Sequence, residues 1–151
     1  MRRLGTHFVG LTSEQSLYNL AVRTVELELI PALRSLGIGL IPYSPLHAGL
    51  LEAATEGGIS DDSTQQRIEA HRDQLEAYEG LCRELGAKPA EVALAWLLRN
   101  PVVSTTAVGA TTSEELRSGL SALSVQLDVE VVERLDRIWP GPGEAPQAYA
   151  W

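Results

Sequence analysis

Short apolar segments alternate with helical patterns along this chain, and that alternation limits the possible folds more than any other feature. The apolar runs cover residues 8–11, 38–43 and 102–110, and each is followed by a stretch with helical spacing. A strand followed by a helix, repeated in this way, implies right-handed βαβ units and a parallel sheet that helices cover. The sequence therefore predicts an α/β fold.

The run 38–43 gives the clearest strand signal. It is continuous, apolar and bounded by Gly and Pro, which is typical of a strand buried on both faces. Pro42 has no backbone N–H, so it argues against a central strand unless the missing N–H falls at the strand's end.

Helical patterns account for most of the remaining chain. Glycines stop the first two patterns, at Gly37 and Gly86, and Thr and Ser followed by acids form a strong start signal near residue 112. The expected helices cover about residues 25–36, 64–85, 89–100, 113–123 and 128–138. Residues 44–64 are rich in small residues, glycine and acid, which indicates a long loop that can carry function.

Composition excludes several classes of protein. Lys and Arg number 12 against 20 Asp and Glu, and the resulting net charge of −8 argues against a nucleic-acid-binding surface. No apolar run has the length of a membrane span or a signal peptide. The single cysteine, Cys82, cannot form an internal disulfide, and no His or Cys spacing indicates a metal site. We therefore expect a cytoplasmic protein that binds neither nucleic acid nor membrane.

Four stretches carry a more specific signal when they are taken in order. They are Glu14-Gln15 with Tyr18-Asn19-Leu20 and Arg23, Gly37-Ile38-Gly39 with Tyr43-Ser44-Pro45-Leu46, Pro89-Ala90 with Ala93-Leu94-Ala95-Trp96, and Val108-Gly109-Ala110-Thr111 with Glu114 and Leu116. Together they resemble the C-terminal half of the aldo-keto reductases, NADP(H)-dependent (β/α)8 barrels that reduce aldehydes and ketones.

The resemblance implies half of a TIM barrel, because a complete barrel takes about 250 residues and this chain has 151. We expect about three parallel βα units plus C-terminal helices in one domain, residues 1–139, followed by a Gly- and Pro-rich tail, residues 140–151. The family's catalytic Asp, Tyr, Lys and His lie on its first four strands and match no position here. The initial Met suggests a gene product of this length, and a cloned fragment is the alternative.

The resemblance also assigns cofactor contacts. Gln15 would hold the nicotinamide amide, Tyr43 would stack on the nicotinamide ring, and Ser44 and Leu46 would lie along the pyrophosphate. By the same resemblance Gly109 and Thr111 would also contact the cofactor. The plainer interpretation is that Tyr43 and Leu46 only fill the C-terminal mouth of the sheet.

The phosphate end departs from the family pattern. Glu52 begins Glu-Ala-Ala where relatives have Thr-Gly-Lys, and Thr112, Glu115 and Gly119 replace an Arg, a Gln and an Asn. Each lost charge-assisted bond to a phosphate costs about 1.5 to 3 kcal/mol. We therefore predict that NADP(H) binding is weak or lost, and we predict no cofactor.

Two classes of function follow. In the first, the chain is a cofactor-independent acid-base enzyme of the lyase, isomerase or cyclase type, acting on a small molecule with a carbonyl group through His47, Tyr43 and Glu14; His47 as a solvated loop residue is the alternative. In the second, it is a subunit of an NADP-dependent aldo-keto reductase, or a non-catalytic partner that completes a barrel with another chain.

An open three-stranded sheet leaves two bare edges whose unpaired N–H and C=O groups need a cover. Self-association is the simplest solution, so we expect a homodimer or another homo-oligomer. A separate chain that supplies the missing half of the barrel is the alternative.

Overall fold

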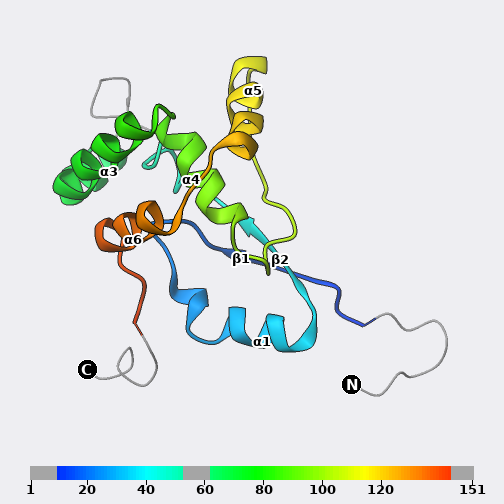
Figure 1. Cartoon of the computed structure of the whole chain (residues 1–151). Helices are drawn as coiled ribbons and strands as arrows, with labels where there is room; N and C mark the ends of the chain where they lie inside the picture. The colour runs from blue at the N-terminus through cyan, green and yellow to red at the C-terminus, as the bar shows by residue number, and fades with distance from the viewer. Residues whose placement is uncertain (1–9, 53–61, 144–151) are drawn as a thin grey trace.

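A computed structural model describes residues 10–52 and 62–143, and two parallel strands lie at its centre (Figure 1). Strand β1 (Ser13–Leu17) pairs with β2 (Gly39–Tyr43) in a register that places Ser13 opposite Gly39 and Leu17 opposite Tyr43. A short 3-10 helix, η1 (Thr24–Glu26), and helix α1 (Leu29–Leu36) connect them. This βαβ unit confirms the predicted α/β class.

The first and third predicted strands differ from the structure. Residues 10–12 are not in a strand, and β1 begins after the run in which it was expected; Phe8 and Val9 lie outside the described residues. Residues 102–107 run beside β2 on the edge away from β1, with bonds from Leu40 N–H to Val102 C=O (2.8 Å) and from Ser104 N–H to Leu40 C=O (2.9 Å). They form a single parallel bridge rather than a third strand.

The physical reason is Pro42, the next residue of β2 that faces residues 102–107 after Leu40. Proline has no N–H to donate, so the ladder loses its next bond, and only the Pro42 carbonyl is used, as acceptor from Ala107 N–H (3.0 Å). The expectation of about three complete βα units is therefore not confirmed. Pro42 lies one residue before the end of β2, so its missing N–H falls near the end of the strand, where a proline is compatible with a strand.

Helices follow the sheet in the order that the sequence predicts. Residues 64–85 contain two helices, because the chain breaks at His71 between α2 (Asp62–Ala70) and α3 (Arg72–Leu85). The next are α4 (Pro89–Leu98), α5 (Ser113–Ser121) with the 3-10 turn η2 (Ala122–Ser124), and α6 (Val129–Ile138). The side chain of Asp128 accepts a bond from Val131 N–H (2.9 Å) and caps α6.

The hydrophobic core lies among β2, α3, α4 and α6. Helix α4 is buried along residues 92–97, as its apolar composition predicts. Among the most completely buried apolar side chains are residues from all of these elements, from the chain after β1 and from the turn after β2: Leu20, Leu40, Leu50, Leu51, Leu75, Leu81, Val92, Leu97 and Leu135.

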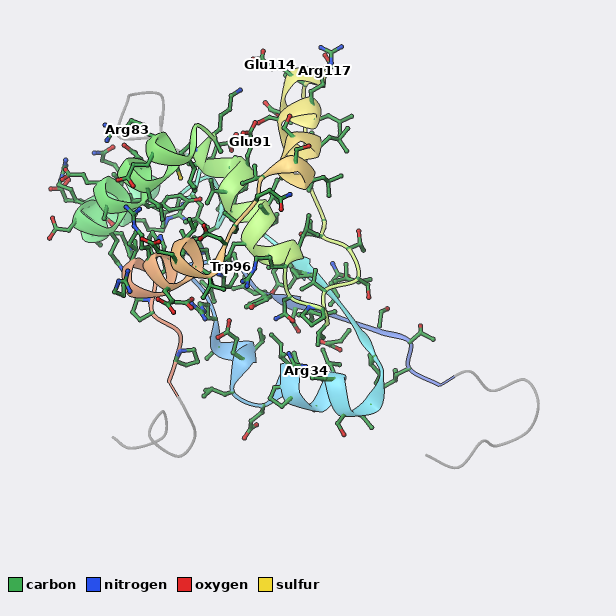
Figure 2. The ribbon with its side chains drawn as sticks, viewed as in Figure 1. Arg34, Arg83, Glu91, Trp96, Glu114 and Arg117 are labelled. Atoms are coloured by element: carbon green, nitrogen blue, oxygen red, sulfur yellow. The ribbon has the colours of Figure 1, made fainter. Side chains whose placement is uncertain are left out.

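Arg23 ties the chain after β1 to the last helix. Its guanidinium donates to Glu26 (2.9 Å), Asp136 (2.6 Å) and the carbonyl of Trp139 (3.0 Å), and it lies 5.0 Å from the ring centre of Trp96, which Figure 2 shows among the helices. Burial acts to lower the pKa of Arg23, but the bonds to Glu26 and Asp136 outweigh it and the pKa is raised. The cation is thus fully paired where it is partly buried.

One face of the sheet stays open within the described residues. The register places Gln15, Ile41 and Tyr43 on this face, where Gln15 is exposed and Tyr43 is 42% exposed, while Leu40 and Pro42 are buried on the other face. Among the described helices, none is both long and apolar enough to span a bilayer.

Candidate functional site

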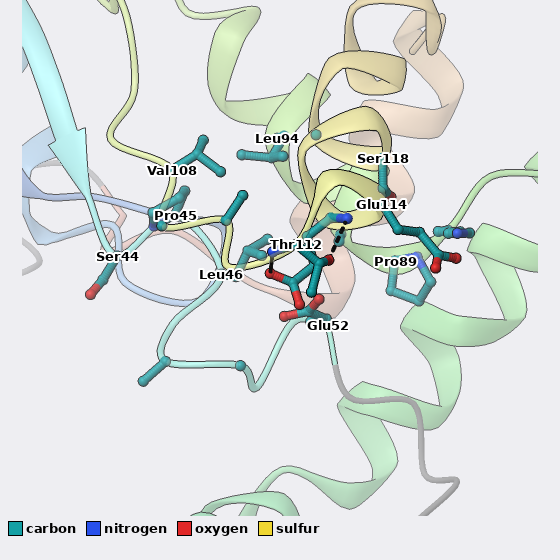
Figure 3. A pocket seen from close by; sticks show the side chains of 18 residues that line it. Ser44, Pro45, Leu46, Glu52, Pro89, Leu94, Val108, Thr112, Glu114 and Ser118 are labelled. Atoms are coloured by element: carbon teal, nitrogen blue, oxygen red, sulfur yellow. Dashed lines mark hydrogen bonds between the residues drawn. The ribbon is translucent and has the colours of Figure 1, made fainter. Parts of the chain in front are cut away.

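A cavity of about 640 Å³ lies beyond the C-terminal end of β2 (Figure 3). Its lining comes from three places in the chain: the turn after β2, the start of α4, and the loop that leads into α5 together with that helix. We call residues 44–52 the turn wall and residues 108–119 the loop wall. The volume falls within the range of small-molecule sites, about 300 to 1,000 Å³.

The turn wall has an unusual backbone. Ser44, His47 and Ala48 have φ angles of 52°, 50° and 51°, in the left-handed region that non-glycine residues rarely adopt, and Gly49 has φ 86°. Conformations of this kind cost about 1 to 3 kcal/mol each and persist only where the surroundings fix them. The turn wall therefore needs an anchor.

Asn19 supplies that anchor from the chain after β1. Its side chain is fully buried and donates from Nδ2 to the carbonyl of Ser44 (2.9 Å). Its Oδ1 accepts from the N–H groups of Ala21 (3.0 Å) and Val22 (2.8 Å). One amide side chain thus joins the C-terminal ends of both strands and holds Ser44 at the edge of the cavity.

The loop wall is held by local bonds around Glu115. Its carboxylate accepts from the N–H (2.7 Å) and the hydroxyl (3.0 Å) of Thr111, and from the N–H of Thr112 (3.4 Å). In return the Thr112 hydroxyl accepts from Glu115 N–H (3.1 Å), which completes a capping box on α5. The bonds from Thr111 lower the pKa of the Glu115 carboxyl, so it is ionised at neutral pH.

The charge of the cavity is negative. Glu52, Glu114 and Glu115 line it, and Lys88 is the one basic residue among the described lining residues. Arg117 lies in the middle of α5, its side chain points away from the rest of the molecule, and it is not among the residues that line the cavity (Figure 2). An anion that enters the cavity therefore meets three carboxylates and one ammonium group.

The structure brings several of the residues assigned by resemblance to this region. Ser44, Leu46 and Gly109 line the cavity. Gln15 and Tyr43 do not line it but share the open face of the adjoining sheet, on neighbouring strands and two register positions apart. Thr111 lies next to the lining residues and is bonded to Glu115.

The three residues predicted for acid-base catalysis are not brought together. Glu14 lies on the opposite face of the sheet from Tyr43, where its carboxylate accepts from the Ser16 hydroxyl (2.9 Å). His47 belongs to the turn wall but does not line the cavity. Burial, then the charges of Arg67 and His71, lower the pKa of His47, so its imidazole is neutral at pH 7.

Two residues of the site were not singled out from the sequence. Asn19 appeared only as part of a motif, and its buried side chain is recognisable only once both strands are in place. Lys88 directly precedes the helix expected at residues 89–100, and it lines the cavity. Within the described residues no group of His, Cys, Asp and Glu is placed to hold a metal ion.

Comparisons with known proteins match the sequence of this chain to one family. The sequence model of the Aldo/keto reductase family matches residues 2–140. The chain is 47% identical over 148 residues to "Uncharacterized oxidoreductase YrpG" of Bacillus subtilis (strain 168), an alignment that covers 95% of this chain and 45% of the relative.

More distant relatives show the same pattern of coverage. "L-glyceraldehyde 3-phosphate reductase" of Escherichia coli O157:H7 is 29% identical, over 85% of this chain and 42% of its own length. "Putative voltage-gated potassium channel subunit beta" of Schizosaccharomyces pombe is 28% identical, over 87% of this chain and 43% of its own length. The chain thus spans less than half the length of each of these curated relatives.

Proposed function

This chain belongs to the aldo/keto reductase family, and from that premise we propose that it is the dinucleotide-binding half of an oxidoreductase barrel. The cavity beyond β2 is the observation that carries the proposal, because Ser44, Leu46 and Gly109, assigned to the cofactor by resemblance, all line it. A nicotinamide dinucleotide, when bound, supplies or accepts a hydride.

The residues suit most parts of such a ligand. Gln15 offers an amide that can pair with a carboxamide, and Tyr43 offers an exposed ring face for stacking, on the same face of the sheet. Ser44 adds a hydroxyl and Leu46 an apolar contact where the cavity begins. The acidic loop wall is the part that does not suit a cofactor with many phosphates.

Length and the open face of the sheet support the proposal that this chain supplies one half of a barrel. Relatives are more than twice as long as the stretch that matches, and the face that carries Gln15 and Tyr43 lies open in the described part of this chain. We propose that the other half of a barrel covers this face and brings the catalytic Asp, Tyr, Lys and His of the family. A homodimer would cover the same edges without restoring those residues.

Cofactor-independent acid-base chemistry at His47 and Tyr43 stays a prediction. The neutral imidazole of His47 is compatible with a base. However, His47 does not line the cavity, and Glu14 is on the other face of the sheet. The geometry therefore favours the dinucleotide-binding proposal.

Binding to the purified 151-residue chain tests the proposal, because residues of this chain alone line the cavity. We expect saturable binding of NADH, followed by nucleotide fluorescence. Gly119→Leu would fill the cavity, since a Cβ placed on Gly119 would lie 3.9 Å from side-chain atoms of both Leu94 and Val108. Binding should fall at least about tenfold in this variant.

Gly80→Leu is the matched control, because it also replaces a helical glycine but meets nothing within 4 Å on α3. It should bind like the original chain. Absence of NADH and NADPH binding by the folded chain, checked by circular dichroism, would overturn the proposal. Equal loss in both variants would also count against the cavity as the site.

A second experiment tests the need for the other half. We expect carbonyl reduction when this chain is co-expressed with the part of the Bacillus subtilis relative that lies outside the alignment, and none with either piece alone. A stable complex of the two pieces without any reduction would contradict the proposed oxidoreductase role.

A further inference from the structure

The backbone N–H groups of the loop wall that are suited to an anion already donate to a side chain of the same loop wall. Backbone N–H groups at the start of a helix form a ready site for phosphate. Here the N–H groups of Thr111 and Thr112 donate to the carboxylate of Glu115, at 2.7 and 3.4 Å. A phosphate could take this position only by displacing a carboxylate that also accepts from the Thr111 hydroxyl.

The charges around Glu115 also oppose the binding of a phosphate. Glu52 and Glu114 line the cavity beside Glu115, and Lys88 is the one cation among the described lining residues. A phosphate monoester carries about −1.5 to −2 charges at neutral pH. The loop wall is thus suited to a group that donates hydrogen bonds and opposes a group that brings more negative charge.

The hydroxyls of an unmodified ribose are donors of this kind, since ionised carboxylates only accept hydrogen bonds. If the nicotinamide lies against Tyr43 and the diphosphate passes Ser44 and Leu46, the far end of the dinucleotide reaches the loop wall. We propose, building on the proposed function, that the cavity accepts dinucleotides with free adenosine ribose hydroxyls, of the NAD(H) type, and rejects those with a ribose phosphate, of the NADP(H) type.

Direct binding measurements on the purified chain test this preference. The dissociation constants of NADH and NADPH should differ at least about tenfold in favour of NADH, which corresponds to the loss of one charge-assisted bond. The fragments ADP and 2′,5′-ADP should compete with NADH in the same order. Neither measurement depends on catalytic activity.

Two variants separate the role of Glu115 from a general charge effect. Glu115→Gln removes the charge and leaves the N–H groups of Thr111 and Thr112 with a neutral amide oxygen, a weaker acceptor that a phosphate displaces more easily. The tenfold preference for NADH over NADPH should therefore fall to about threefold or less. Glu114→Gln removes an equal charge from the same turn of α5 and from the same cavity, but the N–H groups of Thr111 and Thr112 donate to Glu115 instead. It should change the ratio less.

The outcomes are distinguishable. If neither nucleotide binds, the proposed function fails and the preference fails with it. If NADPH binds as tightly as NADH or more tightly, the preference is overturned and the dinucleotide site stands. If Glu115→Gln weakens both nucleotides equally, Glu115 only supports the fold of α5, which also overturns the preference.

Discussion

The two walls of the cavity are built in different ways. The turn wall is anchored by Asn19, a fully buried side chain that reaches it across 25 residues of sequence. The loop wall is anchored by Glu115 and Thr112, which are exposed and bonded within four residues of each other. A buried side chain therefore fixes the backbone of the turn wall, whereas exposed side chains set the charge and the hydrogen-bonding groups of the loop wall.

This difference separates fold from ligand preference. A change at Asn19 would affect the ends of both strands, because its side chain bonds to each side. A change at Glu115 would affect the charge and the free N–H groups of the loop with little effect on the core. Under the proposed function, changes in the loop wall therefore alter nucleotide preference while the fold is kept.

The largest expected effect is at the turn wall. Asn19→Ala removes one donor and one acceptor from a buried position and leaves Ser44 C=O and the N–H groups of Ala21 and Val22 without that partner. We expect the free energy of unfolding to fall by about 3 kcal/mol, since unsatisfied buried polar groups cost about 1 to 3 kcal/mol each. Urea unfolding measures it.

Asn19→Asp is the matched control, because it keeps the acceptor for Ala21 and Val22 but loses the donor to Ser44. At neutral pH its buried carboxylate would face the Ser44 carbonyl oxygen with no proton to donate, so this variant should be no more stable than Asn19→Ala, and it should regain stability as the pH falls and protonation restores a donor. A loss below about 1 kcal/mol for Asn19→Ala, within the range of surface substitutions, would contradict the buried-anchor interpretation of the turn wall.

A smaller effect is expected at the loop wall. Thr112→Ala removes the side-chain cap of α5, for which the usual cost is about 1 kcal/mol, while the carboxylate of Glu115 keeps its bond to Thr111 N–H. Urea unfolding again gives the value, and Thr112→Ser should stay close to the original chain. If Thr112→Ala lowered the free energy of unfolding as much as Asn19→Ala does, the proposed difference between the two walls would be wrong.

The contrast also explains how much of the molecule the sequence predicts. The start of α5 and the burial of α4 follow from local signals, namely Thr112 followed by acids and an apolar run after Pro89, and the structure confirms both. The segment 102–107 has the composition of a strand, but in the fold it lies beside Pro42, which has no N–H where the ladder would continue, and local sequence does not reveal which residues become neighbours. Asn19 was missed for the same reason.

The pH dependence of the loop wall gives a third test. Hydrogen bonds from Thr111 lower the pKa of Glu115 in the folded state, so the unfolded state binds a proton first as the pH falls. The stabilisation is complete above the ordinary carboxyl pKa and is lost as the pH falls through the lowered one. Carbon NMR of the Glu115 carboxyl should show a midpoint below 4.5.

Glu115→Gln provides the control for that titration, because its side chain has no proton to gain in this range. The chemical shifts of the loop N–H groups in this variant should be insensitive to pH between neutrality and the carboxyl range. A Glu115 midpoint at or above 4.5 would show that the loop N–H groups do not hold the carboxylate.

The smallest effect is expected at His47, which belongs to the turn wall but does not line the cavity. Burial, Arg67 and His71 lower its pKa in the folded state, so its contribution to stability is complete above the ordinary value of 6.5 and declines as the pH falls. The imidazole C–H resonance should titrate below 6.5, and His47→Gln should leave NADH affinity unchanged. A loss of affinity in His47→Gln, with the fold intact, would instead place this side chain at the ligand and revive the acid-base hypothesis for the turn wall.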